Sequence, residues 1–416
     1  MLREVAVTYS GLVVGSGIGF LIQLFLQRSM GPSEYGVLGL AVATGTLTGV
    51  LTDLGLSHAM IRFGSKYLAE APGRAMSRFS AVLLWRTVLA VVVSTTGFLT
   101  ARWLAVEVFD KPELLRPLRF VYMTQLGPVL FSFWTFFIQA HQRFGLRSGV
   151  TVATAFTRVV LIASLAWLVG LTPSSVVVSD ATASLVGFVI GMSFSPRGIL
   201  SSTREEVREA SRELIPYCRF TGVLIVGDTL FNELDTLMLG AMAGEEVVGM
   251  YRAAWVYASA VGMLNQSVAN VLFPKVSAIS DVTQLRAYIG RMLRLALGLS
   301  AAMLPLLPAV AWLVPRFEPQ FQPATSVFYI MFAGLVVDLF VGPIAYVLYS
   351  LDRPGVLSAI ALLKIAANVV GNLVMIPLYG AEGAALATVL TRALGGGLTL
   401  FIVARGVRHG ESGANP

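Results

Sequence analysis

The chain has 416 residues, of which 56% are apolar and 13% charged, and its mean hydropathy is +0.76. Soluble globular proteins have roughly 45–50% apolar and about 25% charged residues, so this composition predicts an integral membrane protein and argues against soluble enzymes. The 30 Lys and Arg residues, which give a net charge of +7, are scattered between apolar runs rather than clustered. They therefore predict no nucleic-acid partner.

Twelve apolar runs are long enough to cross a membrane as helices, which takes about 20 mostly apolar residues each. In chain order these predicted spans are 6–27, 36–59, 79–101, 118–140, 148–170, 174–194, 215–240, 247–272, 288–314, 326–349, 355–378 and 381–405. The first run resembles a signal peptide because Arg3 precedes it. It continues to Leu26 without a small-residue cleavage site and is counted as a span.

The basic residues between the spans predict their orientation. With a cytoplasmic N-terminus, the inner segments hold about three times as many Lys and Arg residues as the outer segments, as the positive-inside rule requires. An even number of spans then returns the C-terminus to the same side. The sequence predicts a multi-pass protein of the cytoplasmic (inner) membrane with both termini in the cytoplasm.

The longest polar stretch between spans, 195–214, lies near the middle of the chain. Within it, Thr203 and Glu206 have the spacing of a capping box, which predicts a short helix over 204–213. The predicted organisation is an N-terminal six-helix lobe at 1–194, a cytoplasmic connector at 195–214 and a C-terminal six-helix lobe at 215–416.

The two halves also resemble each other weakly, which favours an internal duplication. At an offset of 213 residues, Gly31 and Gly36 align with Gly244 and Gly249, and at an offset of 210, Gly170 aligns with Gly380. Because each repeat contains six spans, an even number, the two repeats run in the same direction. Parallel repeats are related by an axis along the membrane normal and predict two bundles around a central cavity.

Ionisable residues near the centre of a span cost about 2.5–3.5 kcal/mol on the insertion scale, so they line cavities or pair with each other. Four basic residues lie at that depth: Arg86, Arg158, Lys364 and Arg392. The central acids Asp228 and Asp338 are too few to neutralise all four. The surplus predicts an anionic cargo, and phosphate is the natural partner of guanidinium groups.

Two polar stripes run along predicted spans. Asp228, Asn232 and Asp235 share one face of the seventh span, and Lys364, Asn368 and Asn372 share one face of the eleventh. Such faces look into protein or water rather than lipid. Each stripe fits either a cavity lining or a ladder of ion pairs and hydrogen bonds between helices.

These considerations define the candidate site residues. Those predicted to bind an anionic phosphate or a sugar in the cavity are Arg86, Arg158, Lys364, Arg392, Arg252, Asn232 and Asn368. Those predicted to couple an ion or to form structural pairs are Asp228, Asp338, Asp53 and Asp235. Arg252 lies near the end of a span, where snorkelling of its side chain to the interface is an equally good interpretation.

Enzymatic motifs are absent from the sequence. The single cysteine, Cys218, and three dispersed histidines predict no disulfide and no metal site. There is no phosphate-binding loop, no nucleophile elbow and no zinc-protease motif. The sequence therefore predicts no catalytic residues, no cofactor and no enzymatic activity.

Several turn motifs carry a family resemblance. They are RSMGPSEYG at 28–36, DLGL at 53–56, VGMY at 248–251, LFP at 272–274 and GAEGAALAT at 380–388. Together they resemble the polysaccharide-transporter and O-antigen flippase family, within the multidrug/oligosaccharidyl-lipid/polysaccharide exporter superfamily. The resemblance extends over nearly the whole chain.

The resemblance implies an all-α membrane fold of twelve transmembrane helices in two six-helix lobes around a central cavity. It implies a flippase that moves a lipid-linked oligosaccharide, on an isoprenoid phosphate or diphosphate carrier, across the cytoplasmic membrane by alternating access. The expected role is cell-surface polysaccharide biosynthesis. The expected partners are this isoprenoid-phosphate-linked oligosaccharide, membrane lipids and a proton or sodium ion, and a monomer is expected.

Two alternatives remain open. A multidrug or small-molecule exporter on the same fold is disfavoured because such carriers need an acidic cavity, whereas basic residues predominate here. A membrane-embedded glycosyl or phosphoryl transferase would need acidic metal ligands beside a polar loop, and the sequence shows none.

Overall fold

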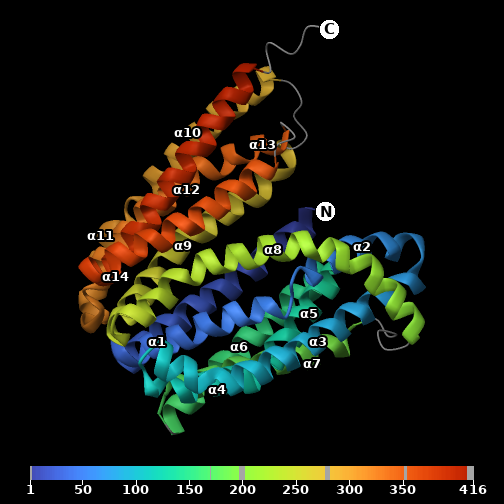
Figure 1. The fold of residues 1–416 in the computed structure, drawn as a ribbon, viewed down its shortest axis with the longest axis horizontal. Helices are drawn as coiled ribbons and strands as arrows, with labels where there is room; N and C mark the ends of the chain where they lie inside the picture. Colours follow the sequence, from blue (N-terminus) through green and yellow to red (C-terminus); the bar gives the residue numbers. More distant parts are fainter. Residues whose placement is uncertain (1, 169, 196–201, 277–281, 351–353, 410–416) are drawn as a thin grey trace. The chain divides into compact units, whose positions relative to one another are not determined.

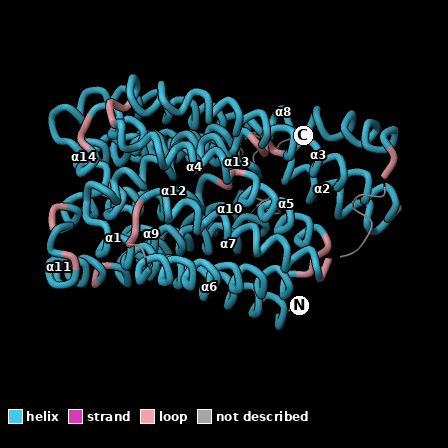
Figure 2. The backbone as a smooth tube through the Cα atoms, turned by 90° about the horizontal axis from the view of Figure 1, so that it is seen from below, coloured by secondary structure: helices cyan, strands magenta, loops and turns pink. Residues whose placement is uncertain are grey.

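The structure is a computed structural model that describes residues 2–168, 170–195, 202–276, 282–350 and 354–409. Every regular element in these ranges is a helix, and the described loops between helices are short (Figure 2). The chain divides into two compact units. Unit 1 comprises Met1–Met30 and Val37–Glu233, and unit 2 comprises Gly31–Gly36 and Leu234–Pro416.

The helices of unit 1 occupy the blue and green part of the chain in Figure 1. They are α1 (Leu2–Leu51), α2 (Leu56–Glu70), α3 (Pro72–Trp103), a π-turn (Leu104–Val108), a 3-10 turn (Pro112–Leu114), α4 (Leu115–Thr124), α5 (Leu126–Ala140), α6 (Phe144–Leu168) and α7 (Pro173–Ser193). A cluster of buried side chains around Phe79, Trp134 and Phe137 joins α2, α3 and α5.

A long helix, α8 (Arg204–Met242), runs from unit 1 into unit 2. The remaining helices are α9 (Glu245–Val276), α10 (Val282–Met303), α11 (Leu306–Phe317), a 3-10 turn (Pro319–Phe321), α12 (Ala324–Ala345), α13 (Val347–Ser350) and α14 (Pro354–His409). Within unit 2, α12 packs against both α9 and α14.

The predicted spans agree with these helices, and the prediction of an all-α membrane fold is confirmed. By length and hydropathy, seven described helices can cross a membrane, or nine if each of two bent pairs is one span. Two of the long helices, α1 and α14, each contain a glycine with non-helical backbone angles, Gly31 and Gly380. Helix α14 therefore contains two of the predicted spans. Helix α1 contains the first and most of the second, which was predicted to extend to residue 59 but ends at Leu51, before the break that precedes α2.

The predicted connector lies partly outside the described residues, at 196–201. Its capping box is present: the Thr203 amide donates to Glu206 Oε2 at 2.7 Å, and the Glu206 amide donates to Thr203 Oγ1 at 3.3 Å. The helix does not end at 213 as predicted. It continues to Met242, with a bend of 48° between its segments Arg204–Arg219 and Thr221–Met242.

The first segment of α8 is part of the unit 1 core rather than a solvated linker. Ala210 and Leu214 are fully buried in the cluster with α2, α3 and α5. Glu213 binds the Arg78 guanidinium at 2.6 Å and accepts a hydrogen bond of 2.9 Å from the Tyr67 hydroxyl. This packing explains why the helix continues past residue 213, because the amphipathic segment buries its apolar face against unit 1.

A close helix crossing in unit 2 supports the internal duplication. A Cβ atom at Gly36 would lie 1.8 Å from the carbonyl oxygen of Glu245, and one at Gly249 would lie 2.0 Å from that of Pro32. Both pairs of equivalent residues, Pro32 with Glu245 and Gly36 with Gly249, are related by the same offset of 213. The contact is therefore reciprocal, as a two-fold axis requires.

The alignment at an offset of 210 residues, which pairs Gly170 with Gly380, has a structural counterpart as well. Gly170, which follows α6, has a φ of 87°, and Gly380, which interrupts α14, has a φ of 55°. Both angles lie in the left-handed region that glycine adopts without steric cost. The two aligned positions therefore share a backbone requirement.

We expect the variant Gly36→Ala to destabilise the protein, because its methyl group would overlap the backbone of α9. Overpacking of this kind costs about 1–3 kcal/mol, which lowers the unfolding midpoint of a chain of this length by about 1–4 °C. Thermal unfolding in detergent measures the change. Gly19→Ala is the matched control in α1, since no atom of the described residues lies within 4 Å of its added carbon. Equal midpoints for the two variants would contradict the close crossing.

Candidate functional site

A polar cavity of about 440 Å³ lies inside unit 1. It is bordered by α1, α2, α3, α7, α8 and the break between α4 and α5. Its polar lining consists of Thr46, Thr52, Asp53, His58, Arg86, Thr124, Gln125, Ser132 and Asp180. The cavity thus contains two of the predicted site residues, Asp53 and Arg86, on facing elements.

Arg86 lies on α3 and is 3% exposed. Its Nη1 atom donates to Ser57 Oγ at 2.9 Å and lies 3.5 Å from Asp53 Oδ1. Its Nε atom is buried and has no hydrogen-bond partner among the described residues. A buried donor without a partner is costly, so this atom retains a capacity to bind an anion or a sugar oxygen in the cavity.

Asp53 is held in place by the break between α1 and α2. Its Oδ1 atom accepts a hydrogen bond of 3.1 Å from the Ser57 amide and a second from the Ser57 hydroxyl. Leu54 and Gly55 both have positive φ angles, of 41° and 86°. A Cβ at Gly55 would lie 2.2 Å from Thr221 Oγ1, so the DLGL element needs a glycine there.

Arg158 lies on α6 and forms an ion pair with Asp180 on α7. Its Nη2 atom donates to Asp180 Oδ2 at 2.9 Å, and its Nε atom contacts Asp180 Oδ1, which gives a two-pronged contact. Such paired contacts fix the geometry of both partners. Asp180, but not Arg158, lines the cavity of unit 1.

A buried carboxylate forms the centre of a second polar cluster, in unit 2. Asp235, on α8, is 3% exposed. It accepts hydrogen bonds from the Asn372 amide at 2.8 Å, from the Thr388 hydroxyl at 2.5 Å and from the Tyr251 hydroxyl. Three donors from α9 and both parts of α14 therefore stabilise a charge that burial alone would make unfavourable.

The asparagines of the eleventh predicted span belong to this cluster. Asn368 and Asn372 are fully buried, and Asn372 Nδ2 donates to Asn368 Oδ1 at 3.1 Å. Asn368 Nδ2 donates to Thr388 Oγ1 at 2.9 Å. The Oδ1 atom of Asn372 is buried and has no hydrogen-bond partner among the described residues. Hard cations prefer carboxylate, amide and hydroxyl oxygens of the kinds gathered here.

The remaining central charges of unit 2 lie on α12 and α14. Arg392 forms an ion pair with Asp338. The aliphatic part of Lys364 lies against Gly395, where a Cβ atom would be 2.7 Å from the lysine Cδ. The glycine thus leaves room for the lysine stem to pass between the two parts of α14.

Three predicted site residues lie outside these clusters. Asp228 and Asn232 are exposed on α8, and Asn232 Nδ2 donates to the Asp228 backbone carbonyl at 2.9 Å. Arg252 is half-buried on α9, next to Tyr251. The three residues of the stripe predicted in the seventh span therefore do not share one environment, because Asp228 and Asn232 are exposed and only Asp235 is buried.

Three of the four central cations have acidic partners. Arg86 pairs with Asp53, Arg158 with Asp180, and Arg392 with Asp338. The predicted surplus of central positive charge is therefore too large, because Asp180 and Asp53 also neutralise central arginines. Asp180 lies seven positions inside an apolar run, so the rule that identified the other ionisable residues also applies to it.

The partners of Asp235 could not be identified from the sequence in the same way. Tyr251 and Thr388 end two of the turn motifs, VGMY and GAEGAALAT, but nothing in these motifs points to Asp235, and only the tertiary structure brings the side chains together. No group of three His, Cys, Asp or Glu side chains able to hold a metal ion occurs in the described ranges.

Residues 1–280 match the model of a family described as polysaccharide biosynthesis protein. The chain belongs to this family. The match covers more than half of the 416 residues and includes all of the described unit 1 cavity. The resemblance seen in the turn motifs is thereby confirmed.

Two similar proteins extend the comparison. The chain is 24% identical over 400 residues to the probable low-salt glycan biosynthesis flippase Agl15 of Haloferax volcanii, a match that covers 92% of this chain and 79% of that protein. It is 21% identical over 289 residues to the putative O-antigen transporter of Escherichia coli K12, covering 67% of this chain and 66% of that protein.

Solved structures show the same fold. The lipid II flippase MurJ, in an inward closed conformation, superposes with a TM-score of 0.75 and 14% identity, covering 97% of this chain and 88% of that chain. An inward-facing multidrug resistance transporter of the MATE family in the MOP superfamily gives a TM-score of 0.76 and 14% identity, covering 97% and 99%. At this identity, the likeness establishes the fold alone.

Proposed function

We propose that the protein is a flippase that moves a lipid-linked oligosaccharide, on an isoprenoid phosphate or diphosphate carrier, across the cytoplasmic membrane. The family membership and the names of the relatives support transport in glycan biosynthesis. The observation that carries the proposal for this chain is Arg86, a buried guanidinium in a polar cavity whose Nε donor has no partner among the residues that the structure describes. Guanidinium donors suit phosphate oxygens, and the surrounding hydroxyl and amide groups suit a sugar.

In this proposal the protein acts as a monomeric secondary transporter by alternating access, and it is not an enzyme. Both termini lie in the cytoplasm, as the distribution of basic residues favours. The glycan enters the polar cavity while the apolar carrier chain stays in the bilayer, because moving sugar hydroxyls into hydrocarbon, or the isoprenoid chain into water, is unfavourable. Arg86 and Asp53 line this route, while Arg158 fixes Asp180 at its edge.

The buried Asp235 cluster is the proposed site of the coupling ion, either sodium or a proton. The carboxylate is held by three donors and lies beside the Asn372 amide oxygen, which has no partner in the described part of the chain. With small side-chain rotations, these oxygens can bind a cation. Binding would neutralise the carboxylate and change its hydrogen bonds to α9 and α14. Ion binding would thereby change helix packing in unit 2.

Ligand-induced stabilisation tests the proposed substrate class. An oligosaccharide on a short isoprenoid diphosphate should raise the unfolding midpoint of the purified protein, since a ligand at 100 times its Kd stabilises by about 2.7 kcal/mol. The same sugar without the diphosphate, and a lipophilic cationic drug, should leave the midpoint unchanged. Stabilisation by the drug alone would favour the multidrug exporter instead.

A further inference from the structure

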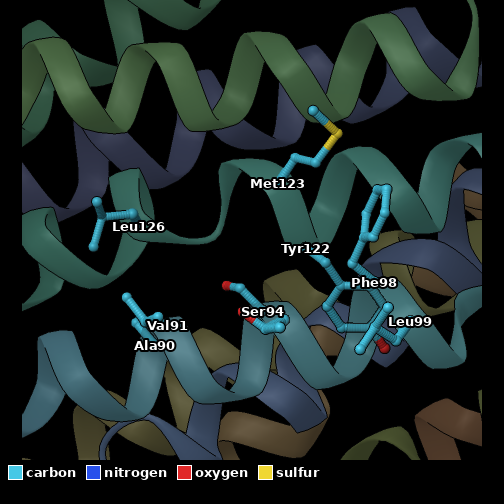
Figure 3. A pocket seen from close by; sticks show the side chains of 9 residues that line it. Ala90, Val91, Ser94, Phe98, Leu99, Tyr122, Met123 and Leu126 are labelled. Carbon is cyan, nitrogen blue, oxygen red and sulfur yellow. The ribbon is translucent and has the colours of Figure 1, made fainter.

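A groove of about 420 Å³ opens on the surface of unit 1 between α3 and the break that separates α4 from α5 (Figure 3). Its α3 wall runs from Ala90 to Leu99, and Tyr122, Met123 and Leu126 form the facing wall. Most of these side chains are apolar, and Leu99 and Met123 are 73% and 65% exposed. In a membrane-spanning helix, such an apolar hollow faces the hydrocarbon.

The groove exists because the fourth predicted span is broken. The segments Pro112–Thr124 and Leu126–Ala140 meet at an angle of 45°. Pro128 has no amide hydrogen, so the carbonyl of Thr124 has no helical donor four residues later, and the helix bends there. The bend displaces the start of α5 from the line of α4 and leaves the hollow beside α3.

A second cavity, of about 610 Å³, continues the groove toward the beginning of α4. The two share Phe98 and Met123, but the second is lined by charged side chains: Glu113, Arg116 and Arg119. The Arg119 guanidinium lies over the Phe98 ring at 5.4 Å. Neither arginine forms an ion pair with a described carboxylate, so this end of the groove carries a net positive charge.

We propose that this surface is a binding site for one anionic phospholipid. The lipid phosphate lies between Arg116 and Arg119, and one acyl chain fills the groove along α3. The apolar part explains why the ligand is a lipid rather than free phosphate, and the two guanidinium groups explain why its headgroup is anionic. Basic residues occur at only one end of the groove, which fits a resident lipid held at one depth better than a carrier that crosses the bilayer.

The site has a direct structural connection to the polar cavity of unit 1. Along the break, Val121, Thr124 and Gln125 line the cavity, whereas the intervening Tyr122 and Met123 line the groove. A lipid in the groove therefore supports the backbone that carries the cavity wall. We expect anionic lipid to stabilise unit 1 independently of any transported substrate.

Native mass spectrometry of the full chain tests this proposal with two added probes, phosphatidylglycerol and phosphatidylcholine. One phosphatidylglycerol should bind about thirtyfold more tightly than phosphatidylcholine, the contribution expected of two guanidinium groups near the bilayer surface. The double variant Arg116→Gln/Arg119→Gln should lose this preference. Ser94→Phe, which fills the groove, should weaken binding of both lipids.

Matched controls separate the site from general effects of charge and volume. Arg102→Gln removes an exposed charge from the last turn of α3, and Val92→Phe enlarges an exposed side chain of α3 that does not line the groove. Both controls should bind phosphatidylglycerol like the unaltered chain. Equal affinity for the two lipids, or an equal loss of phosphatidylglycerol binding in the control and site variants, would overturn the proposal. Displacement of phosphatidylglycerol by an equimolar isoprenyl phosphate would overturn it in favour of the carrier.

Discussion

Replacing Asp235 by asparagine should abolish the effect of an ion gradient on transport while leaving the protein folded. The amide has nearly the same shape as the carboxylate, and its one oxygen can still accept the hydrogen bonds of the Tyr251 and Thr388 hydroxyls, whereas its NH2 group replaces the oxygen that accepts from Asn372. It carries no charge and cannot bind a proton or hold a sodium ion strongly. We expect gradient-driven transport to fall at least about tenfold, a loss of about 1.4 kcal/mol in coupling free energy.

Two measurements identify the ion. Sodium added in excess should raise the unfolding midpoint of the unaltered protein if sodium is the coupling ion, and this increase should vanish in Asp235→Asn. If the ion is a proton, the midpoint should respond to pH and not to sodium. Glu209→Gln is the control, because Glu209 is exposed near the start of α8. Transport by Asp235→Asn that still responds to the gradient would refute the proposed ion site.

Removing the charge of Arg86 should cause the largest loss of substrate recognition. Truncating Arg86 alone would leave the half-buried Asp53 without its partner, which costs up to about 3–5 kcal/mol and confounds folding with function. The double variant Arg86→Met/Asp53→Asn avoids this, because Met fills the volume of the arginine stem and Asn can still accept a hydrogen bond from the Ser57 amide. Stability should change little, whereas a charge-assisted hydrogen bond worth about 1.5–3 kcal/mol is lost.

Flipping by this double variant should therefore decrease at least about tenfold. The single variant Asp53→Asn distinguishes substrate binding by Arg86 from its ion pair with Asp53, since it keeps the Arg86 guanidinium and frees it for substrate. The control is Arg143→Gln, which removes a basic residue next to α5 and α6 that does not line the cavity. Normal flipping by the folded double variant would mean that Arg86 and Asp53 form only a structural pair.

The sequence was sufficient to predict the spans because their determinants are local. Apolar length identifies a membrane helix, and Thr203 with Glu206 marks the start of α8 through contacts three residues apart. The end of the predicted short helix at 213 was wrong for the opposite reason. Its continuation depends on packing of Ala210 and Leu214 against distant helices, which no local signal reports.

The candidate sites likewise combine residues that local sequence identifies with partners that only tertiary packing brings to them. Central charges such as Arg86 and Arg392 are visible in the sequence because they interrupt apolar runs, but their partners depend on which helices become neighbours. The turn Gly31–Gly36 is a clear example, since it belongs to unit 2 although the chain on both sides of it belongs to unit 1. The reciprocal contact of Gly36 with α9 requires the tertiary structure, although the repeat offset of 213 already aligned Gly36 with Gly249.

The central claim is translocation of a lipid-linked glycan, and a flipping assay in proteoliposomes tests it most directly. The purified protein is reconstituted with an isoprenoid-diphosphate oligosaccharide confined to one leaflet, and a membrane-impermeant glycosidase reports the fraction that reaches the other. We predict rapid loss of sidedness that requires the protein, increases with an ion gradient and is reduced at least about tenfold in Arg86→Met/Asp53→Asn. A glycan lipid that stays in its original leaflet at the rate of protein-free vesicles would contradict the account.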